Sequence, residues 1–191
     1  MNLLILGAGG HGRVVREVAE ATGQYENIAF LDDNWKAEDV AQNHSDVIGR
    51  LSDYDEFTGQ FDYAFVAIGN PEVRKKYQEL LMDSYEIATL VHPVAHISSS
   101  ASVGKGTVMM AGAVVQTNSK IGAGCIISAG AILDHDSVVG DYCHINAGAT
   151  VPSMSTVAAM TKVDYGAVYH KTDEKWVEEH KRQYGTEPSF F

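Results

Sequence analysis

The chain has 191 residues, 45% of them hydrophobic, and its 25 acidic and 14 basic residues give a formal charge of −11. This length allows one large domain or two small ones with a buried core. The negative charge would repel a phosphate backbone, so we expect no nucleic-acid partner. No apolar stretch approaches the ~20 residues of a membrane span and no cationic leader precedes the first apolar run. The sequence therefore predicts a cytoplasmic protein without membrane insertion.

The first half alternates short apolar runs with amphipathic segments. Residues 3–6 form an apolar run typical of a buried strand, and an amphipathic helix is expected from residue 13. Further strands are expected at 28–31, 63–68 and 87–91, with a helix over 72–82 before the last of them. This order predicts an α/β domain with a parallel sheet.

A glycine-rich turn lies between the first strand and the first helix. Residues 7–12 read Gly-Ala-Gly-Gly-His-Gly, which is G-x-G-x-x-G, and Asp32 follows Gly12 by twenty residues. A dinucleotide fold uses such an acid for ribose, but this segment supplies only one mononucleotide-binding half. We therefore predict a nucleotide-sugar site, with the base or ribose near Asp32 or Asp33 and the phosphates near the amides of Gly9, Gly10, His11 and Gly12. The alternative is that the glycines serve only close packing of helix and strand.

The second half repeats every six residues. From Val91 to Val163 every sixth residue is apolar, and the residue four positions later is always small. This period predicts a triangular parallel β-helix with 18 residues in each coil. Cys125 and Cys143 lie one coil apart and point inward, so we interpret them as small, reduced core residues.

Several outward-facing positions of this β-helix are apolar. An exposed apolar column favours burial against another subunit, and faces that repeat by threes make a C3 trimer the natural assembly. The periodicity alone does not exclude a dimer. The residues are Val108, Val114, Ile126, Ile132 and Val138.

Six motifs together resemble the hexapeptide-repeat sugar acyltransferases, which include UDP-amino-sugar N-acetyltransferases and sialic-acid O-acetyltransferases. The resemblance implies an α/β half domain followed by a left-handed parallel β-helix, a homotrimer, and acetyl-CoA bound between neighbouring prisms. It also implies a nucleotide-linked sugar held by the N-terminal domain. The motifs are residues 7–12, Phe30-Leu31-Asp32-Asp33, Ala67-Ile68-Gly69-Asn70, Val91-His92-Pro93, Asp134-His135-Asp136 and His144.

The resemblance also assigns roles to individual residues. His135 is similar to the family's general base, and Asp136 to the acid that orients it. An exposed imidazole with a pKa of ~6.5 can take a proton near neutral pH, which agrees with this role. His144 is similar to the histidine near the acetyl end of the cofactor. The expected nucleotide-sugar contacts are His11, Asp32 and the Gly69-Asn70 pair.

Two serines occupy positions where the family commonly has other residues. Ser128 stands seven residues before His135, where an asparagine often contacts the acceptor. Ser153 stands one coil beyond His135, where the family offers a glycine amide to the thioester of acetyl-CoA. We place Ser128 in the sugar site and both His144 and Ser153 in the acetyl-CoA site, and we expect no metal.

The sequence thus predicts three segments. These are a nucleotide-sugar-binding domain at 1–88, an acyltransferase β-helix at 89–168, and a C-terminal helix and tail at 169–191. The predicted reaction moves an acetyl group from acetyl-CoA to an amine or hydroxyl of a nucleotide-linked sugar. The alternatives are a nucleotide-sugar-binding or regulatory module that has lost catalysis, and a nicotinamide-dependent enzyme indicated only by the glycine turn.

Overall fold

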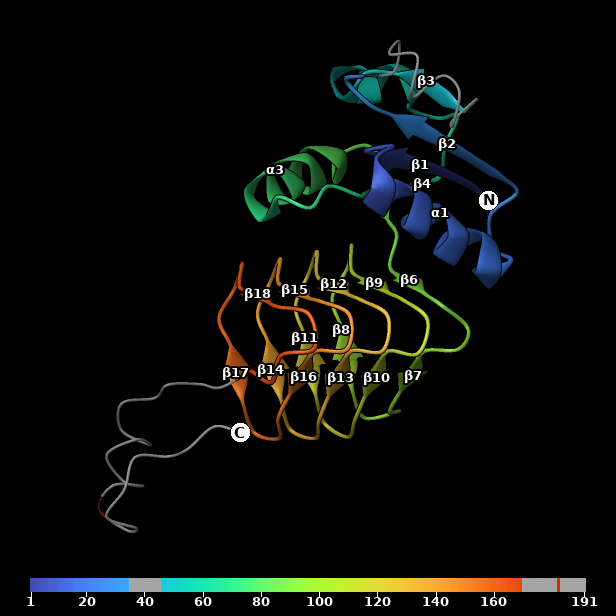
Figure 1. The fold of residues 1–191 in the computed structure, drawn as a ribbon. Coiled ribbons are helices and arrows are strands. Elements are labelled where there is room, and N and C mark those ends of the chain that lie inside the picture. Colours follow the sequence, from blue (N-terminus) through green and yellow to red (C-terminus); the bar gives the residue numbers. More distant parts are fainter. Residues whose placement is uncertain (35–45, 170–181, 183–191) are drawn as a thin grey trace.

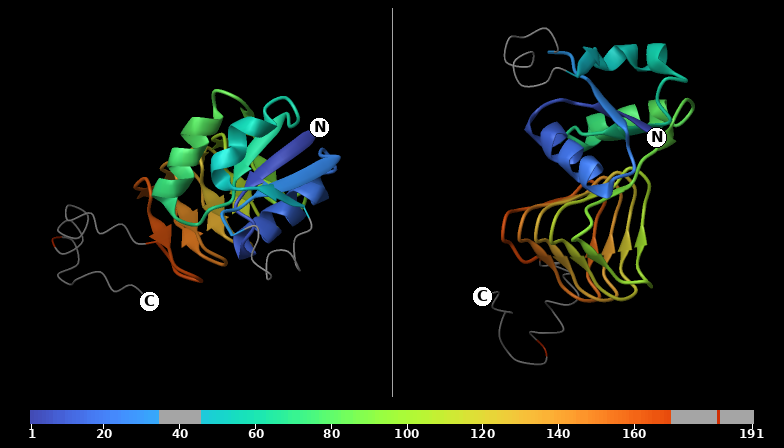
Figure 2. Two further views of the ribbon diagram at one scale, coloured as in Figure 1. Left: turned by 90° about the horizontal axis from the view of Figure 1, so that it is seen from above. Right: turned by 90° about the vertical axis from the view of Figure 1, so that its right-hand side faces the viewer.

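The structure is a computed structural model that describes residues 1–34, 46–169 and 182. An α/β domain stands on one side of a stack of β-helical coils (Figure 1). Two further views show this domain over the same side of the coils (Figure 2). None of the described helices is long and apolar enough to cross a membrane. The C-terminal helix and tail expected at 169–191 lie outside the described residues, apart from Tyr169 and Arg182.

The α/β domain contains a five-stranded parallel sheet with the order β3-β2-β1-β4-β5. Successive side chains of a strand point to opposite faces. On one face Leu3 and Ile5 pack with Val15 of α1, and on the other Leu4 and Leu6 pack with Leu81 of α3. The elements are β1 (Asn2–Leu6), α1 (Gly10–Thr22), β2 (Asn27–Leu31), β3 (Val47–Gly49), the 3₁₀ helix η1 (Leu51–Phe57), β4 (Tyr63–Val66), α3 (Pro71–Leu81) and β5 (Glu86–Ile87).

This domain confirms the expected order of strands and helices, with three differences. The strand expected at 63–68 ends at Val66, because the chain turns into the loop before α3. The run expected at 87–91 is divided, since β5 belongs to the α/β sheet and Leu90–Val91 begins the β-helix. The sequence analysis did not anticipate β3 or η1.

The β-helix is built from two-residue strands joined by corners, and the expected triangular architecture is confirmed. Residues 18 apart are paired in parallel, as Val114 is with Ile132. Cys125 and Cys143 are both buried in the core of the coils. The strands are β6 (Leu90–Val91), β7 (His96–Ile97), β8 (Ser102–Val103), β9 (Val108–Met109), β10 (Val114–Val115), β11 (Lys120–Ile121), β12 (Ile126–Ile127), β13 (Ile132–Leu133), β14 (Val138–Val139), β15 (His144–Ile145), β16 (Thr150–Val151), β17 (Thr156–Val157) and β18 (Lys162–Val163).

The α/β domain covers one of the three sheets of the prism, formed by β6, β9, β12, β15 and β18, which we call the covered sheet. Val108 and Ile126 on this sheet are 0% and 1% exposed and pack in one cluster with Val15 of α1. The expectation that another subunit buries these two residues is therefore wrong, because the chain's own N-terminal domain does so. Ile132 and Val138, on the other two sheets, remain 41% and 37% exposed.

Candidate functional site

The three loops predicted to bind the nucleotide sugar meet at one edge of the α/β sheet. β1 lies between β2 and β4 in parallel register, so the carboxyl ends of these three strands are neighbours. Two backbone bonds join the loops: Gly7 N donates to Leu31 O at 2.8 Å, and Ala67 N donates to Leu6 O at 2.8 Å. Ligands of open α/β sheets bind at such carboxyl ends.

The glycines of the turn have different structural roles. A Cβ on Gly12 would lie 2.0 Å from Gly7 O, so this glycine is required for close packing of α1 on β1. A Cβ on Gly9 would have no atom within 4 Å, and the Gly9 backbone has a φ of −68°. Gly9 is also the N-cap of α1, where no side chain caps the helix. The helix therefore presents backbone N–H groups that can bind a phosphate.

The polar residues of the same edge organise its loops. Asp32 Oδ2 accepts from Ala8 N at 2.8 Å and its Oδ1 accepts from Asn34 N at 2.9 Å. Asp33 Oδ1 accepts from Leu51 N at 3.1 Å. A carboxylate offers about four lone-pair sites, so both acids keep acceptor capacity for a ribose.

Asn70 has a similar double role beside Gly69. Its Oδ1 accepts from Val73 N at 3.0 Å and caps the N-terminus of α3. Its amide nitrogen is a further donor. A Cβ on Gly69 would have no atom within 4 Å, so a ligand could approach the backbone closely at this position.

Two histidines from different domains lie at the junction below this edge. The pKa of His11 is lowered to about 4, mainly by burial and to a smaller extent by the charges of His144 and Arg74. The pKa of His144 is also lowered to about 4, mainly by burial and to a smaller extent by the charges of Arg74 and Lys162. Both imidazoles are therefore neutral at physiological pH. His11 Nε2 is buried without a hydrogen-bond partner, and His144 Nε2 lies 3.2 Å from Ser128 Oγ.

A small cavity of about 50 Å³ lies beside His144. It is lined from the α/β domain by Gly69, Pro71 and Arg74, and from the coils by Tyr142, His144 and residues 160–162. The cavity lies between the predicted nucleotide-sugar edge and the coils, and Ser128 contacts one of its lining residues, His144. The assignment of His144 to the acetyl-CoA site stays a prediction.

A second group of polar residues lies at residues 134–137, between β13 and β14, which we call the His135 corner. His135 Nδ1 lies 2.8 Å from Asp136 Oδ2, and both side chains are about half exposed. Asn118 Nδ2 donates to Asp136 Oδ1 at 3.1 Å from the preceding coil. The hydrogen bond to Asp136 raises the pKa of His135. When Nδ1–H donates to Asp136, Nε2 is left unprotonated and can accept a proton from a substrate.

A surface depression of about 410 Å³ adjoins this corner. It is lined by Ser100, Asn118, Lys120, Asp136 and Val138. Among the residues that the structure describes, no group of three or more His, Cys, Asp or Glu side chains is arranged to hold a metal ion.

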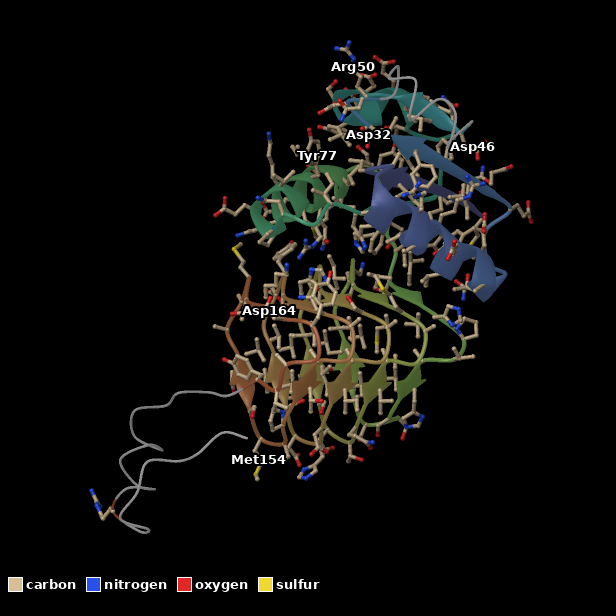
Figure 3. All side chains as sticks on the ribbon, viewed as in Figure 1. Asp32, Asp46, Arg50, Tyr77, Met154 and Asp164 are labelled. Carbon is tan, nitrogen blue, oxygen red and sulfur yellow. The ribbon has the colours of Figure 1, made fainter. Side chains whose placement is uncertain are left out.

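The His135 corner lies far from the nucleotide-binding edge of the same chain. It joins the two sheets of the prism that the α/β domain leaves uncovered, so it is opposite the covered sheet. Met154, whose N–H donates to His135 O at 3.1 Å, marks this corner at the bottom of Figure 3, whereas Asp32 is near the top. Ser153 stacks one coil beyond His135 and belongs to the same corner, not to the junction that holds His144.

Comparison with known proteins gives matches to both domains. The PglD N-terminal domain family matches residues 2–81, and the bacterial transferase hexapeptide family matches residues 118–153. The acetyltransferase domain of PglB from Neisseria gonorrhoeae, solved with acetyl coenzyme A, is 34% identical with a TM-score of 0.81, over 87% of this chain and 80% of that chain. This chain belongs to the hexapeptide-repeat sugar acyltransferases of the PglD type. The left-handed parallel β-helix and α/β half domain expected for this family are confirmed.

Two further relatives are sugar N-acetyltransferases by name. A point mutant of perosamine N-acetyltransferase from Caulobacter crescentus, solved with CoA and GDP-perosamine, is 28% identical over 89% of each chain, with a TM-score of 0.79. UDP-N-acetylbacillosamine N-acetyltransferase from Bacillus subtilis is 37% identical over 113 residues, which are 58% of this chain. The match spans 51% of that enzyme, about half its length.

The sequence analysis missed Asn118 and Arg74 as site residues. Asn118 could have been found, because it stands 18 residues before Asp136 and therefore stacks on it. Arg74 gave no comparable signal, since its partners are backbone carbonyls, which have no sequence signature.

Proposed function

We propose that this protein transfers an acetyl group from acetyl-CoA to the amine of a nucleotide-linked sugar, with His135 as general base. A hydroxyl acceptor is the alternative. The observation that carries the proposal is the His135–Asp136 pair, an exposed imidazole whose Nδ1 lies 2.8 Å from a carboxylate oxygen. The names of the Bacillus and Caulobacter relatives, both N-acetyltransferases, support an amine as the acceptor.

In the proposed reaction, the sugar nitrogen attacks the thioester carbon while His135 Nε2 takes the proton that the nitrogen loses. Asp136 stabilises the imidazolium that forms. Backbone amides of the coil that contains Ser153 would stabilise the oxyanion of the tetrahedral intermediate. Collapse of this intermediate breaks the carbon–sulfur bond, and the coenzyme A thiolate leaves with the proton that His135 had taken, which returns the imidazole to its neutral form. The products are the acetamido sugar and free coenzyme A.

We further propose that the working site forms between chains of a homotrimer. One chain cannot bring its own His135 to its own nucleotide-binding edge, because the prism lies between them. A neighbouring prism can place its His135 corner beside that edge, and a closed C3 ring repeats this contact three times. The exposed Ile132 and Val138, on the strands that flank the corner, support such contacts.

Three further assignments belong to this proposal. Residues 1–88 hold the nucleotide sugar, and residues 89–168 supply the His135 corner and the acetyl-CoA site. The proposed nucleotide-sugar residues are Gly9, Gly10, His11, Gly12, Asp32, Asp33, Gly69 and Asn70 at the edge, with Ser128 on the coils, and the proposed acetyl-CoA residues are His144 and Ser153. A cytoplasmic location is supported by Cys125 and Cys143, which are buried and unpaired as in a reducing compartment.

Mixing two inactive variants tests the reaction and the shared site together. His135→Ala removes the base, and Gly9→Val fills the open space above the turn at a φ that valine tolerates. Each variant alone should release almost no coenzyme A thiol with acetyl-CoA and the acceptor sugar. Co-assembled trimers should regain activity at roughly one site in four, because random mixing pairs an intact edge with a neighbour's intact base that often.

The result of mixing separates the alternatives. If the mixture stays inactive while the wild type is active, base and edge belong to one chain and the shared site is wrong. If the wild type binds a nucleotide sugar but transfers no acetyl group, the protein is a nucleotide-sugar-binding module.

A further inference from the structure

An arginine of α3 is almost completely buried between the two domains. Arg74 is 1% exposed, and the structure gives its side chain no carboxylate ion pair among the described residues. Burying a charged group is costly unless its donors are satisfied, so a buried arginine needs strong hydrogen bonds. Its partners are backbone carbonyl oxygens from both domains.

The guanidinium donates four hydrogen bonds that cross the domain junction. On the coil side, Nε donates to Gly124 O and Nη2 to Tyr142 O, both at 2.7 Å. On the α/β side, Nη1 donates to Ile68 O at 2.7 Å and to Gly69 O at 2.9 Å. The planar fork of arginine holds its donors in a fixed geometry, which lysine cannot reproduce.

The two acceptors on the α/β side belong to the loop that follows β4, next to Asn70. This loop is one of the three at the nucleotide-binding edge, and Gly69 also lines the cavity beside His144. Arg74 therefore sets the distance between this loop and the coils. A ligand that reaches from the edge across the junction would depend on that distance, whereas a ligand confined to the glycine turn would not.

We infer that Arg74 is a positioning residue for the sugar part of the acceptor: it fixes the Ile68–Gly69 loop against the coils so that a sugar extending from the bound nucleotide is held at the domain junction. The inference rests on the proposed function only for the identity of the ligand. The four hydrogen bonds of Arg74 do not depend on the proposed function.

Gln78 provides a matched control, since it lies one turn further along the same buried face of α3. It is 3% exposed and donates to Lys105 O at 3.2 Å, but no hydrogen bond joins it to the described loop after β4. Gln78→Met should therefore loosen the docking of α3 without releasing Ile68 or Gly69. Lys75→Met changes an exposed cation on the same helix and controls for charge.

The experiment compares nucleotides with nucleotide sugars. Calorimetry with UDP, GDP, UDP-N-acetylbacillosamine and GDP-perosamine identifies the pair that the wild type binds. For that pair, Arg74→Met and Arg74→Lys should keep the affinity for the nucleotide. They should lower the affinity for the nucleotide sugar by about tenfold or more, because a small misplacement of a binding group is costly. Gln78→Met and Lys75→Met should leave the ratio of the two affinities unchanged.

Two results would overturn the inference. One is an Arg74→Met protein that is folded and keeps the wild-type ratio of affinities. The other is an equal change of that ratio in Gln78→Met, which would show that general loosening of the junction is responsible.

Hydrogen exchange separates failure of this inference from failure of the proposed function. If the wild type binds none of the four probes, the proposed ligand is wrong, and the amides of Val73 and residue 74, which donate to Asn70, still report on the loop. Their exchange should be faster in Arg74→Met than in Gln78→Met. Equal exchange in the two variants would contradict the positioning role.

Discussion

Asp136 accepts two side-chain hydrogen bonds from opposite sides, and the shorter, at 2.8 Å, joins it to the ring of its neighbour His135. This hydrogen bond stabilises the protonated imidazole and is the largest cause of the raised pKa of His135. A general base works only in its neutral form. Acetyl transfer should therefore fall as the pH drops through this raised pKa.

We expect His135→Ala to lower turnover by ~10²–10⁴-fold, the usual loss for a general base, with nucleotide-sugar affinity nearly unchanged. Asp136→Asn should cost less and move the acid limb of the pH profile to lower pH, since the imidazole loses the partner that raises its pKa. Thiol release measured across the pH range checks both variants. Undiminished transfer by His135→Ala would assign the proton to another group.

Asn118 should act on His135 only through Asp136. Its amide donates to Asp136 Oδ1 at 3.1 Å and helps lower the pKa of that carboxyl, after the larger contribution of His135. In Asn118→Ala the carboxylate can rotate, so kcat should fall by about tenfold or less while KM for the acceptor is unchanged. NMR of the ¹⁵N-labelled imidazole should show a smaller fraction of the Nδ1-protonated tautomer. A wild-type tautomer ratio in this variant would exclude the positioning role.

The two buried histidines should make stability depend on pH. The folded-state pKa of His11, about 4, lies below the ~6.5 of an unfolded histidine, so the unfolded state binds more protons between these values. Stability is then full above about pH 6.5 and is lost as the pH falls toward 4, by up to roughly 1.4 kcal/mol per pH unit for each histidine. His144, which is more exposed to solvent, should contribute less than this limit.

Urea unfolding between pH 4.5 and 7.5 measures this dependence. His11→Gln should flatten the curve, because glutamine does not titrate in this range. His96→Gln changes an exposed histidine on β7 and should leave the curve as it is. A pH dependence unchanged by His11→Gln would place the titrating group elsewhere.

Substitutions of two glycines in the turn should affect ligand binding and stability to different extents. Gly12→Ala places a Cβ 2.0 Å from Gly7 O, so it should lower the free energy of unfolding by about 1–3 kcal/mol, as overpacking does. Gly9→Val meets no atom within 4 Å, so it should lower the melting temperature less than Gly12→Ala does, although valine is a poor N-cap, and it should weaken nucleotide-sugar binding. Thermal shift with and without ligand compares the two. Unchanged ligand stabilisation of Gly9→Val would show that phosphate does not bind over this turn.

The hexad register predicted the stacking of individual residues, such as Val114 on Ile132, because an 18-residue coil allows only one pairing. It could not predict which sheet of the prism the α/β domain covers, since all three carry the same repeat. That choice depends on contacts such as the two bonds from Arg74 to the carbonyls of Gly124 and Tyr142, which any residue could supply. The separation of His135 from the nucleotide-binding edge follows from which sheet is covered, so the sequence could not predict it either.

The uncovered sheets should hold the proposed trimer together. Val114 and Ile132 stack one coil apart on β10 and β13, and Ile132 is 41% exposed, whereas Ile126 is covered by the α/β domain. Replacing both Val114 and Ile132 with aspartate would bury unpaired charge in a subunit contact, which is strongly destabilising. Light scattering should then show monomers. Met82→Asp, at a 60% exposed position after α3, serves as the control and should leave the trimer intact.

Activity should be lost together with the trimer, because the proposed site needs the base of one chain and the edge of another. The monomeric double variant should still bind the nucleotide sugar, since the α/β domain of each chain supplies that edge. A wild-type protein that is monomeric in light scattering would refute both the interface and the shared site. A monomeric variant with full acetyl transfer would refute the shared site alone, and would require each His135 to reach its own chain's acceptor despite the prism between them.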